Sequence, residues 1–294
     1  MRLILTVLCR DEEDIIEAFC KFHLDKGVDH IIATDNKSID RTRTILQKFE
    51  NKGLLTIIDE PEHNHDQAIW VSRMAKIAGE QLKADWIINS DADEFWWPKT
   101  GNLKKEFRRT NQETNALKVK RTNFLPPDHQ ISTETPFWKS MIIREKSSLN
   151  SLGSPLPPKV CHRAISDAFI EDGNHTVKSA STPIITEDTE SIEILHYPIR
   201  SYWQFERKIR QGAEALHTNK RVSKNIGSTW KHLYEEHLKK HSLFEHYCNL
   251  RPGKDIVESK IRANELVEDK RILQHMSGHV KGMALNRFRR FIAK

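Results

Sequence analysis

The sequence lacks several features that define whole classes of proteins. Its four cysteines form no CxxC pair and are spread over 294 residues, which indicates reduced thiols rather than a disulfide framework. It has no run of about 18 apolar residues, so no transmembrane helix is predicted. The apolar N-terminal run is too short for a secretory signal, and acidic residues follow it directly. We therefore expect a cytoplasmic protein.

The two commonest nucleotide-binding motifs are also missing. The chain contains neither G-x-G-x-x-G nor G-x-x-x-x-G-K-[ST], which excludes the standard dinucleotide-binding and P-loop classes. Acidic residues are fewer than basic ones: the chain has 41 Asp and Glu and 47 Lys and Arg, which gives a net charge of +6. This excess suits an anionic substrate, a phosphate-bearing ligand or a membrane surface, and the charge alone does not choose among them.

Short apolar strands alternate with amphipathic helices over the first 98 residues. The helices are expected at residues 11–27, 38–53 and about 66–83, because apolar residues recur there at helical spacing. The strands are expected at residues 2–8, 30–34, 54–58 and 84–90. Such alternation predicts an α/β fold with a mostly parallel central sheet and helices on both faces.

The second half of the chain has weaker patterns. Strands are expected within 114–127, 137–144 and 191–199, and 150–159 is a Pro- and Gly-containing loop that could move over a site. From residue 201 the pattern is helical, with one apolar stripe through Trp203 or Phe205, Ile209, Ala213 and Leu216 and another through Trp230, Leu233, Tyr234, Leu238 and Phe244. We predict one domain over 1–200, with halves 1–98 and 99–200, and a helical C-terminal extension over 201–294.

Three carboxylates crowd the end of the fourth predicted strand, in the stretch WIINSDADEFWWP. Asp91, Asp93 and Glu94 repel one another unless a cation or ligand lies among them. A D-x-D pair at a strand end suits a hard divalent ion that also binds a diphosphate. The alternative is that Asp91 caps a turn and Glu94 is solvated. The aromatic residues at 95–97 suit either the core or stacking on a sugar.

Polar residues also follow the first two strands. Arg10 suits a phosphate or base contact and Glu12 an acceptor, although acids are common at a helix N-terminus. Asp35 and Asn36 suit a nucleobase contact or an ordinary Asx turn. Because parallel strands end at one edge of a sheet, these groups and the acidic cluster are expected to converge.

Four motifs carry a resemblance to a known family. They are CRDEED, the turn TDNKSIDRT, WIINSDADEF, and HYPI followed by RSY. In this order they resemble family 2-like glycosyltransferases of GT-A fold, in the subgroup related to glycosyltransferase family 92, over residues 2 to about 215. The resemblance implies transfer of a sugar from a nucleotide diphosphate donor, UDP-type first, to a saccharide hydroxyl with Mn²⁺ or Mg²⁺.

The resemblance also implies roles for individual residues. Asp91 and Asp93 would hold the ion, completed by His196 or, second, His175; the alternative for each histidine is a core position. Residues of the nucleotide pocket would be Arg10, Glu12, Asp35, Asn36, Gln67, Arg73 and Asp91.

An inverting reaction, which the family implies, needs a carboxylate base. The candidates are Asp172, then Glu171, then Glu94, although a Glu-Asp-Gly turn is also ordinary loop chemistry. The chain departs from the family pattern at Asp11, where Asn is usual, and at 37 and 41, where Lys and Arg replace Gly; these cations could reach a diphosphate.

Two basic segments near the C-terminus have both a plain and a functional interpretation. HLKKH, residues 237–241, has zinc-ligand spacing but no general-base Glu, and a solvated face is favoured. Residues 281–294 suit either a packed terminal helix or peripheral contact with anionic lipid. No nucleic-acid partner is expected. The competing functions are a nucleotidyl or phosphoryl transferase with the same metal site, and a non-catalytic polysaccharide-binding module.

Overall fold

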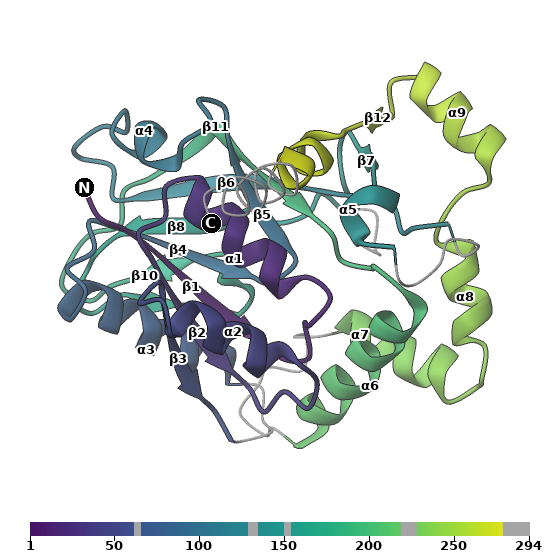
Figure 1. Cartoon of the computed structure of the whole chain (residues 1–294), viewed down its shortest axis with the longest axis horizontal. Helices are drawn as coiled ribbons and strands as arrows, with labels where there is room; N and C mark the ends of the chain where they lie inside the picture. Colours follow the sequence, from purple (N-terminus) through teal and green to yellow (C-terminus); the bar gives the residue numbers. More distant parts are fainter. Residues whose placement is uncertain (62–65, 129–134, 150–153, 219–227, 279–294) are drawn as a thin grey trace, which may run out of the picture.

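A computed structural model describes residues 1–61, 66–128, 135–149, 154–218 and 228–278 (Figure 1). Its centre is an eight-stranded sheet with the order β3-β2-β1-β4-β8-β6-β11-β5. The strands are β1 Leu3–Cys9, β2 His30–Asp35, β3 Leu55–Asp59, β4 Trp86–Asp91, β5 Glu94–Pro98, β6 Ala116–Asn123, β8 Lys159–Arg163 and β11 Thr186–His196. The first four run parallel, β8 is antiparallel to β4 and β6, and β11 is parallel to β6 and antiparallel to β5.

Helices cover both faces of the sheet, as the alternating pattern predicts. Helix α1 Ile16–Asp25 and helix α2 Thr42–Glu50 pack with Leu3 and Leu5 of β1 in the main core. Helix α3 Gln67–Glu80 packs on the other face, against Ile4 of the same strand. Adjacent residues of β1 point to opposite faces, so a strand that is apolar throughout is buried on both sides. The predicted α/β architecture is confirmed.

The second half differs in detail from the prediction. Residues 137–144 do not form one strand: Pro136 precedes a short helix, α5 Phe137–Ser140, and only β7 Ile143–Glu145 is extended. Proline fixes a backbone angle suited to a helix start. The predicted loop 150–159 ends in strand β8, and its residues 150–153 lie outside the described ranges. The remaining short elements are α4 Leu103–Phe107, β9 Phe169–Ile170, the 3₁₀ turn η1 Asp172–Asn174, β10 Val177–Lys178 and β12 Leu266–Glu268.

The chain is helical from residue 202 to 262 within the described ranges, on the side where β11 ends (Figure 1). Phe205, Ile209 and Ala213 are buried as predicted, whereas Trp203 is 68% exposed and Phe244 is 55% exposed. The side chain of Leu216 and the basic segment 281–294 are outside the described residues. The elements are α6 Tyr202–Thr218, α7 Ser228–Leu233, the π-helix η2 Tyr234–Leu238, α8 Leu243–Asn249 and α9 Lys254–Arg262.

The last described segment returns to the sheet. Strand β12 pairs with β7, and Ile272 and Met276 belong to the main core. The division into a domain over 1–200 and an extension over 201–294 therefore stays a prediction. Within the described ranges, every helix is too short or too polar to span a bilayer.

A buried histidine of α1 should make stability depend on pH. His23 is fully buried; its Nδ1 donates to the carbonyl of Phe19 at 2.9 Å, and its Nε2 accepts from the amide of Trp96 at 3.2 Å. Burial lowers the pKa of His23 from 6.5 to about 3. The unfolded chain therefore takes up a proton that the folded chain refuses, and stability is lost as pH falls from 6.5 toward 3.

The variant His23→Gln should flatten this dependence. We expect the slope of unfolding free energy against pH between 6 and 4 to fall by about 1.4 kcal/mol per pH unit, measured by urea denaturation. The exposed His232→Gln control should keep the wild-type slope. Parallel curves for wild type and His23→Gln would contradict the buried, neutral state.

Candidate active site

The acidic cluster lies in the turn between two strands that are consecutive in sequence, although three strands separate them in the sheet. Asp91 ends β4 and Glu94 begins β5, with only two residues between them. The carbonyl of Asp93 accepts from the amide of Tyr197 at 2.9 Å, which anchors this turn to the segment after β11. The three carboxylates thus stand at the edge of the core, and each has cationic or polar partners.

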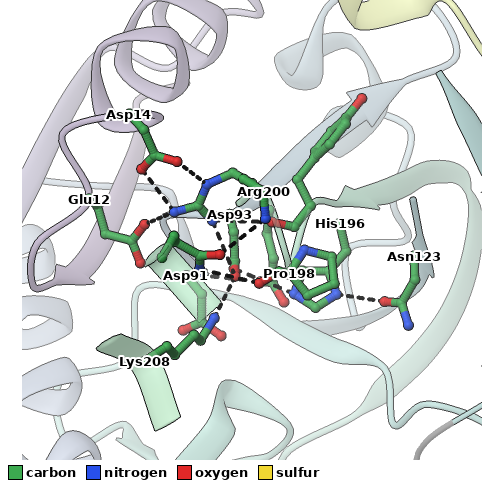
Figure 2. A network of polar contacts seen from close by, with 12 residues as sticks. Glu12, Asp14, Asp91, Asp93, Asn123, His196, Pro198, Arg200 and Lys208 are labelled. Carbon is green, nitrogen blue, oxygen red and sulfur yellow. Dashed lines mark hydrogen bonds and ion pairs between the residues drawn. The ribbon is translucent and has the colours of Figure 1, made fainter. Parts of the chain in front are cut away.

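Asp93 is the centre of a network of charged side chains (Figure 2). Its side chain is 3% exposed, and its Oδ2 accepts from Lys208 Nζ of α6 at 2.8 Å. Its Oδ1 lies 3.5 Å from His196 Nε2, and its Oδ2 lies 4.0 Å from Arg200 Nη1. Burial alone would raise the pKa of the Asp93 carboxyl, but the Lys208 charge holds it well below its usual range. Asp93 is therefore ionised at neutral pH.

His196 is oriented by a neighbour on the adjacent strand. Its Nδ1 donates to Asn123 Oδ1 at 2.7 Å, and the two residues are register partners at the ends of β11 and β6. This bond leaves Nε2 directed at Asp93 (Figure 2). An imidazole fixed in this way is a typical metal ligand or hydrogen-bond partner.

Arg200 joins the first loop to the acidic turn. Its side chain is 1% exposed, and its Nε donates to Asp14 Oδ2 at 2.7 Å. It also contacts Glu12 and donates to the carbonyl of Tyr197 at 3.1 Å (Figure 2). Burial raises the pKa of Glu12 to about 7, against the opposing charge of Arg200. Arg200 is thus a positioning residue between the ends of β1 and β4.

The other two carboxylates turn toward a buried lysine. Lys159 at the start of β8 is 1% exposed and lies 2.5 Å from Asp91 Oδ2 and 3.1 Å from Glu94 Oε1. Arg121 Nη1 adds a contact to Glu94 at 3.3 Å, and Asn174 donates to Asp91 Oδ1 at 3.2 Å. Burial raises the pKa of Glu94. Burial also opposes the charged form of Asp91, but the charge and hydrogen bond of Lys159, together with the charge of Arg121, lower the pKa of Asp91.

Arg10, just beyond β1, presents unsatisfied donors. Its Nε and Nη1 are buried and have no hydrogen-bond partner among the described residues. Asp11 next to it is a structural residue: its Oδ1 accepts from the amide of Ile39 at 2.7 Å, and its Oδ2 accepts from Gln211 of α6 at 2.6 Å. The Asp that departs from the family pattern therefore ties the second turn and α6 to the first loop.

The remaining residues predicted for the nucleotide pocket have protein partners. Asp35 accepts from the amide of Ser38, three residues on, at 3.2 Å, and Asn36 donates to the carbonyl of Glu60 at 3.3 Å. Gln67 accepts from the amide of Gly173 at 3.0 Å, and Arg73 donates to Glu60 at 2.9 Å. Their roles toward a nucleotide stay predictions.

The two cations of the second turn lie outside the Asp93 network, and their contact with a diphosphate stays a prediction. Arg41 is exposed and pairs with Glu13 at 2.8 Å, while Lys37 is exposed with a positive φ of 58°. Neither contacts the Asp93 network. Lys208 and Arg200 supply positive charge there instead.

The predicted metal ligands are only partly brought together. Asp93 and His196 are adjacent, but Asp91 faces Lys159, and His175 donates from Nδ1 to the carbonyl of Pro158 at 2.8 Å. Within the described part of the chain, no three His, Cys, Asp or Glu side chains form a metal-binding group. Of the predicted ligands, Asp93 and His196 are brought together, and their role toward an ion stays a prediction.

The three candidate bases lie in different surroundings. Asp172 accepts from the amide of Ala68 at 3.2 Å, at the start of α3. Glu171 pairs with Lys178, and both side chains are exposed. Glu94 is fully buried.

The comparisons identify the family. A model of glycosyltransferase family 92 matches residues 10–274, and the chain belongs to this family. No curated protein matches the chain. Family membership and the mostly parallel sheet confirm the predicted GT-A architecture and enzyme class, and they favour sugar transfer over the two competing functions.

Solved structures show weaker likeness. Residues 1–349 of TarS from S. aureus share 14% identity, with 84% of this chain and 79% of that chain covered and a TM-score of 0.42. The mannosyltransferase PcManGT from Pyrobaculum calidifontis, in complex with GDP-Man and Mn²⁺, shares 18% identity over 40% of this chain, with a TM-score of 0.32. The match spans 35% of the PcManGT chain. At these scores the likeness adds nothing to the assignment.

The residue-level prediction missed the counter-charges of the site. Lys159, Arg121, Arg200 and Lys208 received no role, although each contacts one of the predicted acids. One signal was available: the run from 207 to 210 places three cations on α6, off the apolar stripe of Phe205 and Ile209.

Proposed function

We propose that the chain transfers a sugar from a nucleoside diphosphate sugar to a saccharide hydroxyl. A UDP-sugar is the first candidate for the donor. The observation that carries the proposal is Arg10 at the carboxyl end of β1: its buried Nε and Nη1 make no hydrogen bond among the described residues, and the nearest carboxylate oxygen, Asp11 Oδ2, is 3.9 Å from Nε. Buried nitrogen donors without a hydrogen bond are costly unless a ligand supplies the acceptor. A phosphate or nucleobase provides acceptors of the required kind.

The Asp93 network would hold the diphosphate. Asp93 Oδ1 and His196 Nε2 lie 3.5 Å apart and offer an oxygen and a nitrogen donor, which fit Mn²⁺ or Mg²⁺ with phosphate and water as further ligands. Such an ion would offset the negative charge of the departing diphosphate. Lys208 and Arg200 would contribute positive charge beside it, since both already face Asp93. Asp91 would support Asp93 and His196 indirectly, through its contacts with Lys159 and Asn174.

An inverting transfer would use Asp172 as the base. Asp172 belongs to the η1 turn, and Asn174 of that turn donates to Asp91, so the turn is tied to the acidic cluster. Glu171 forms an ion pair with the exposed Lys178, and Glu94 is buried away from solvent. Asp172 is therefore favoured over the other two to remove the proton of the acceptor hydroxyl.

Donor binding tests the proposal. Wild type should melt at a higher temperature with UDP and Mn²⁺ than with either alone, because a ligand that binds only the folded state stabilises it. Arg10→Ala should weaken UDP affinity roughly 10- to 100-fold in calorimetry, the effect of losing a charged hydrogen bond. The matched control Arg109→Ala, at a side chain 70% exposed, should leave affinity unchanged.

Two outcomes would contradict the proposal. Equal UDP affinity in Arg10→Ala and wild type would show that the nucleotide does not bind at this loop. Release of sugar 1-phosphate rather than UDP during turnover with UDP-sugars would show that UMP is transferred, and nucleotidyl transfer would then replace sugar transfer.

A further inference from the structure

A cavity lies in the helical region, outside the Asp93 network. Its volume is about 360 Å³, and its walls come from α6, the π-helix η2 and the start of α8. Glu206 and Arg210 of α6 line it, whereas Lys208 of the same helix contacts Asp93. Residues two apart on a helix are about 200° apart around its axis, so the cavity opens on the side of α6 that faces away from Asp93. Nothing described so far uses this cavity.

The lining combines aromatic rings with balanced charges. Tyr202 and Tyr234 contribute their rings; Arg210 pairs with Glu206 at 2.5 Å, and Lys239 of the lining pairs with Glu235 at 2.8 Å. Each cation already has a carboxylate, so the wall carries no surplus charge for a phosphate or another anion. Carboxylates accept from hydroxyl groups, and guanidinium and ammonium groups donate to them. A neutral polyhydroxylated ligand fits this combination.

Exposed aromatic side chains extend the wall outward. The Tyr202 ring lies 5.0 Å from Phe244 and 5.4 Å from Trp203, both with edge-on geometry. Trp203 is 68% exposed and Phe244 is 55% exposed, although the sequence pattern favours core positions for such rings. A surface that combines aromatic rings with polar groups binds ligands that have an apolar face and polar edges. A pyranose ring is such a ligand.

The backbone of the cavity is irregular at the same place. Tyr234–Leu238 forms a π-helix, and its Tyr234 and Leu238 are partly buried against the cluster of Phe205, Ile209, Leu243 and Tyr247. Isolated π-helical turns occur frequently at functional sites. This irregular turn brings Tyr234 and Leu238 into the cavity wall.

We propose that this cavity is a non-catalytic binding site for a neutral oligosaccharide, formed by Tyr202, Glu206, Arg210 and Tyr234 with Trp203 at its rim. The inference rests on the proposed function in one respect: the bound saccharide would be part of the acceptor. A chain held across α6 from Asp93 is kept near the transfer site without touching the reacting groups. Longer acceptors would therefore bind more tightly than short ones.

Calorimetry with defined neutral tetrasaccharides, such as chitotetraose, cellotetraose and maltotetraose, tests the site. At least one should bind wild type, and Trp203→Ala and Tyr234→Ala should each weaken its affinity about tenfold, the effect of losing one aromatic contact. UDP affinity with Mn²⁺ should be unchanged in both variants, which also shows that they are folded. The matched control Phe169→Ala removes another exposed aromatic side chain, 45% exposed on β9, and should change neither affinity.

The outcomes separate this site from the catalytic proposal. Binding that persists at wild-type affinity in both variants, or no binding of any tetrasaccharide, overturns the inference. Competition by inorganic phosphate at the same side chains also overturns it, because the site would then be an anion site. If Asp93→Asn retains full turnover while the tetrasaccharide still binds, the proposed catalytic role fails and the oligosaccharide site stands.

Discussion

Asp93→Asn should lower sugar transfer by roughly a thousandfold or more while the protein stays folded, the scale seen when a group that stabilises developing charge is removed. Asparagine keeps the shape of the side chain but removes the negative charge that faces His196, Lys208 and Arg200. The proposed ion would lose a charged ligand, and the two cations would lose their shared partner. The measurement is release of UDP and of glycosylated product from a UDP-sugar, with and without Mn²⁺.

The control for this experiment is another aspartate with the same charge change. Asp188 lies exposed on β11, and Asp188→Asn should keep wild-type turnover. Near-ultraviolet circular dichroism and the melting temperature report whether Asp93→Asn is folded. A second variant, His196→Gln, should also lower turnover and shift the Mn²⁺ requirement to higher concentration. Turnover of Asp93→Asn within twofold of wild type would refute its role.

Lys159→Met should destabilise the fold by about 3–5 kcal/mol, the usual result of removing one partner from a buried ion pair. The lysine is 1% exposed, and the carboxylates of Asp91 and Glu94 lie 2.5 Å and 3.1 Å from its Nζ. Methionine fills a similar volume but leaves these acids with less compensating charge in the core. Arg121 reaches Glu94 but not Asp91 among the described ion pairs, so it replaces the lysine only in part. Urea denaturation at pH 7 measures the change.

A surface lysine provides the matched comparison. Lys120 of β6 is 77% exposed and lies 3.9 Å from an exposed partner, Glu190, so Lys120→Met should change stability by less than about 1 kcal/mol. The double variant Lys159→Met with Glu94→Gln should recover part of the loss, because one uncompensated acid is removed. A loss below about 1 kcal/mol in Lys159→Met would show that these acids do not depend on the lysine.

The first half of the fold was predictable because its signals are local. The apolar runs of β1 and β4 and the helical spacing of α1 to α3 are complete within 20 residues, and each predicts its element without reference to the rest of the chain. The convergence of Arg10, Asp35 and Asp91 at strand ends follows from parallel topology alone. Strand β8 was missed because it is five residues long and follows two prolines.

The counter-charges of the site were not predictable in the same way. Lys208 lies 115 residues from Asp93 in the sequence, and Lys159 lies 68 residues from Asp91. No periodicity connects partners at such separations. The sequence shows that acids crowd together and therefore need compensation, but only the packed chain shows which of 47 basic residues provides it.

The long-range bonds of Arg200 have a consequence for how the enzyme is made. Arg200 follows its partner Glu12 by 188 residues, and it connects the earliest loop of the chain to one of the latest strands. During synthesis the acids at 91–94 emerge from the ribosome well before Arg200 and Lys208, so a nascent chain carries them without those two counter-charges. The Asp93 network is thus completed only after residue 208 has been translated.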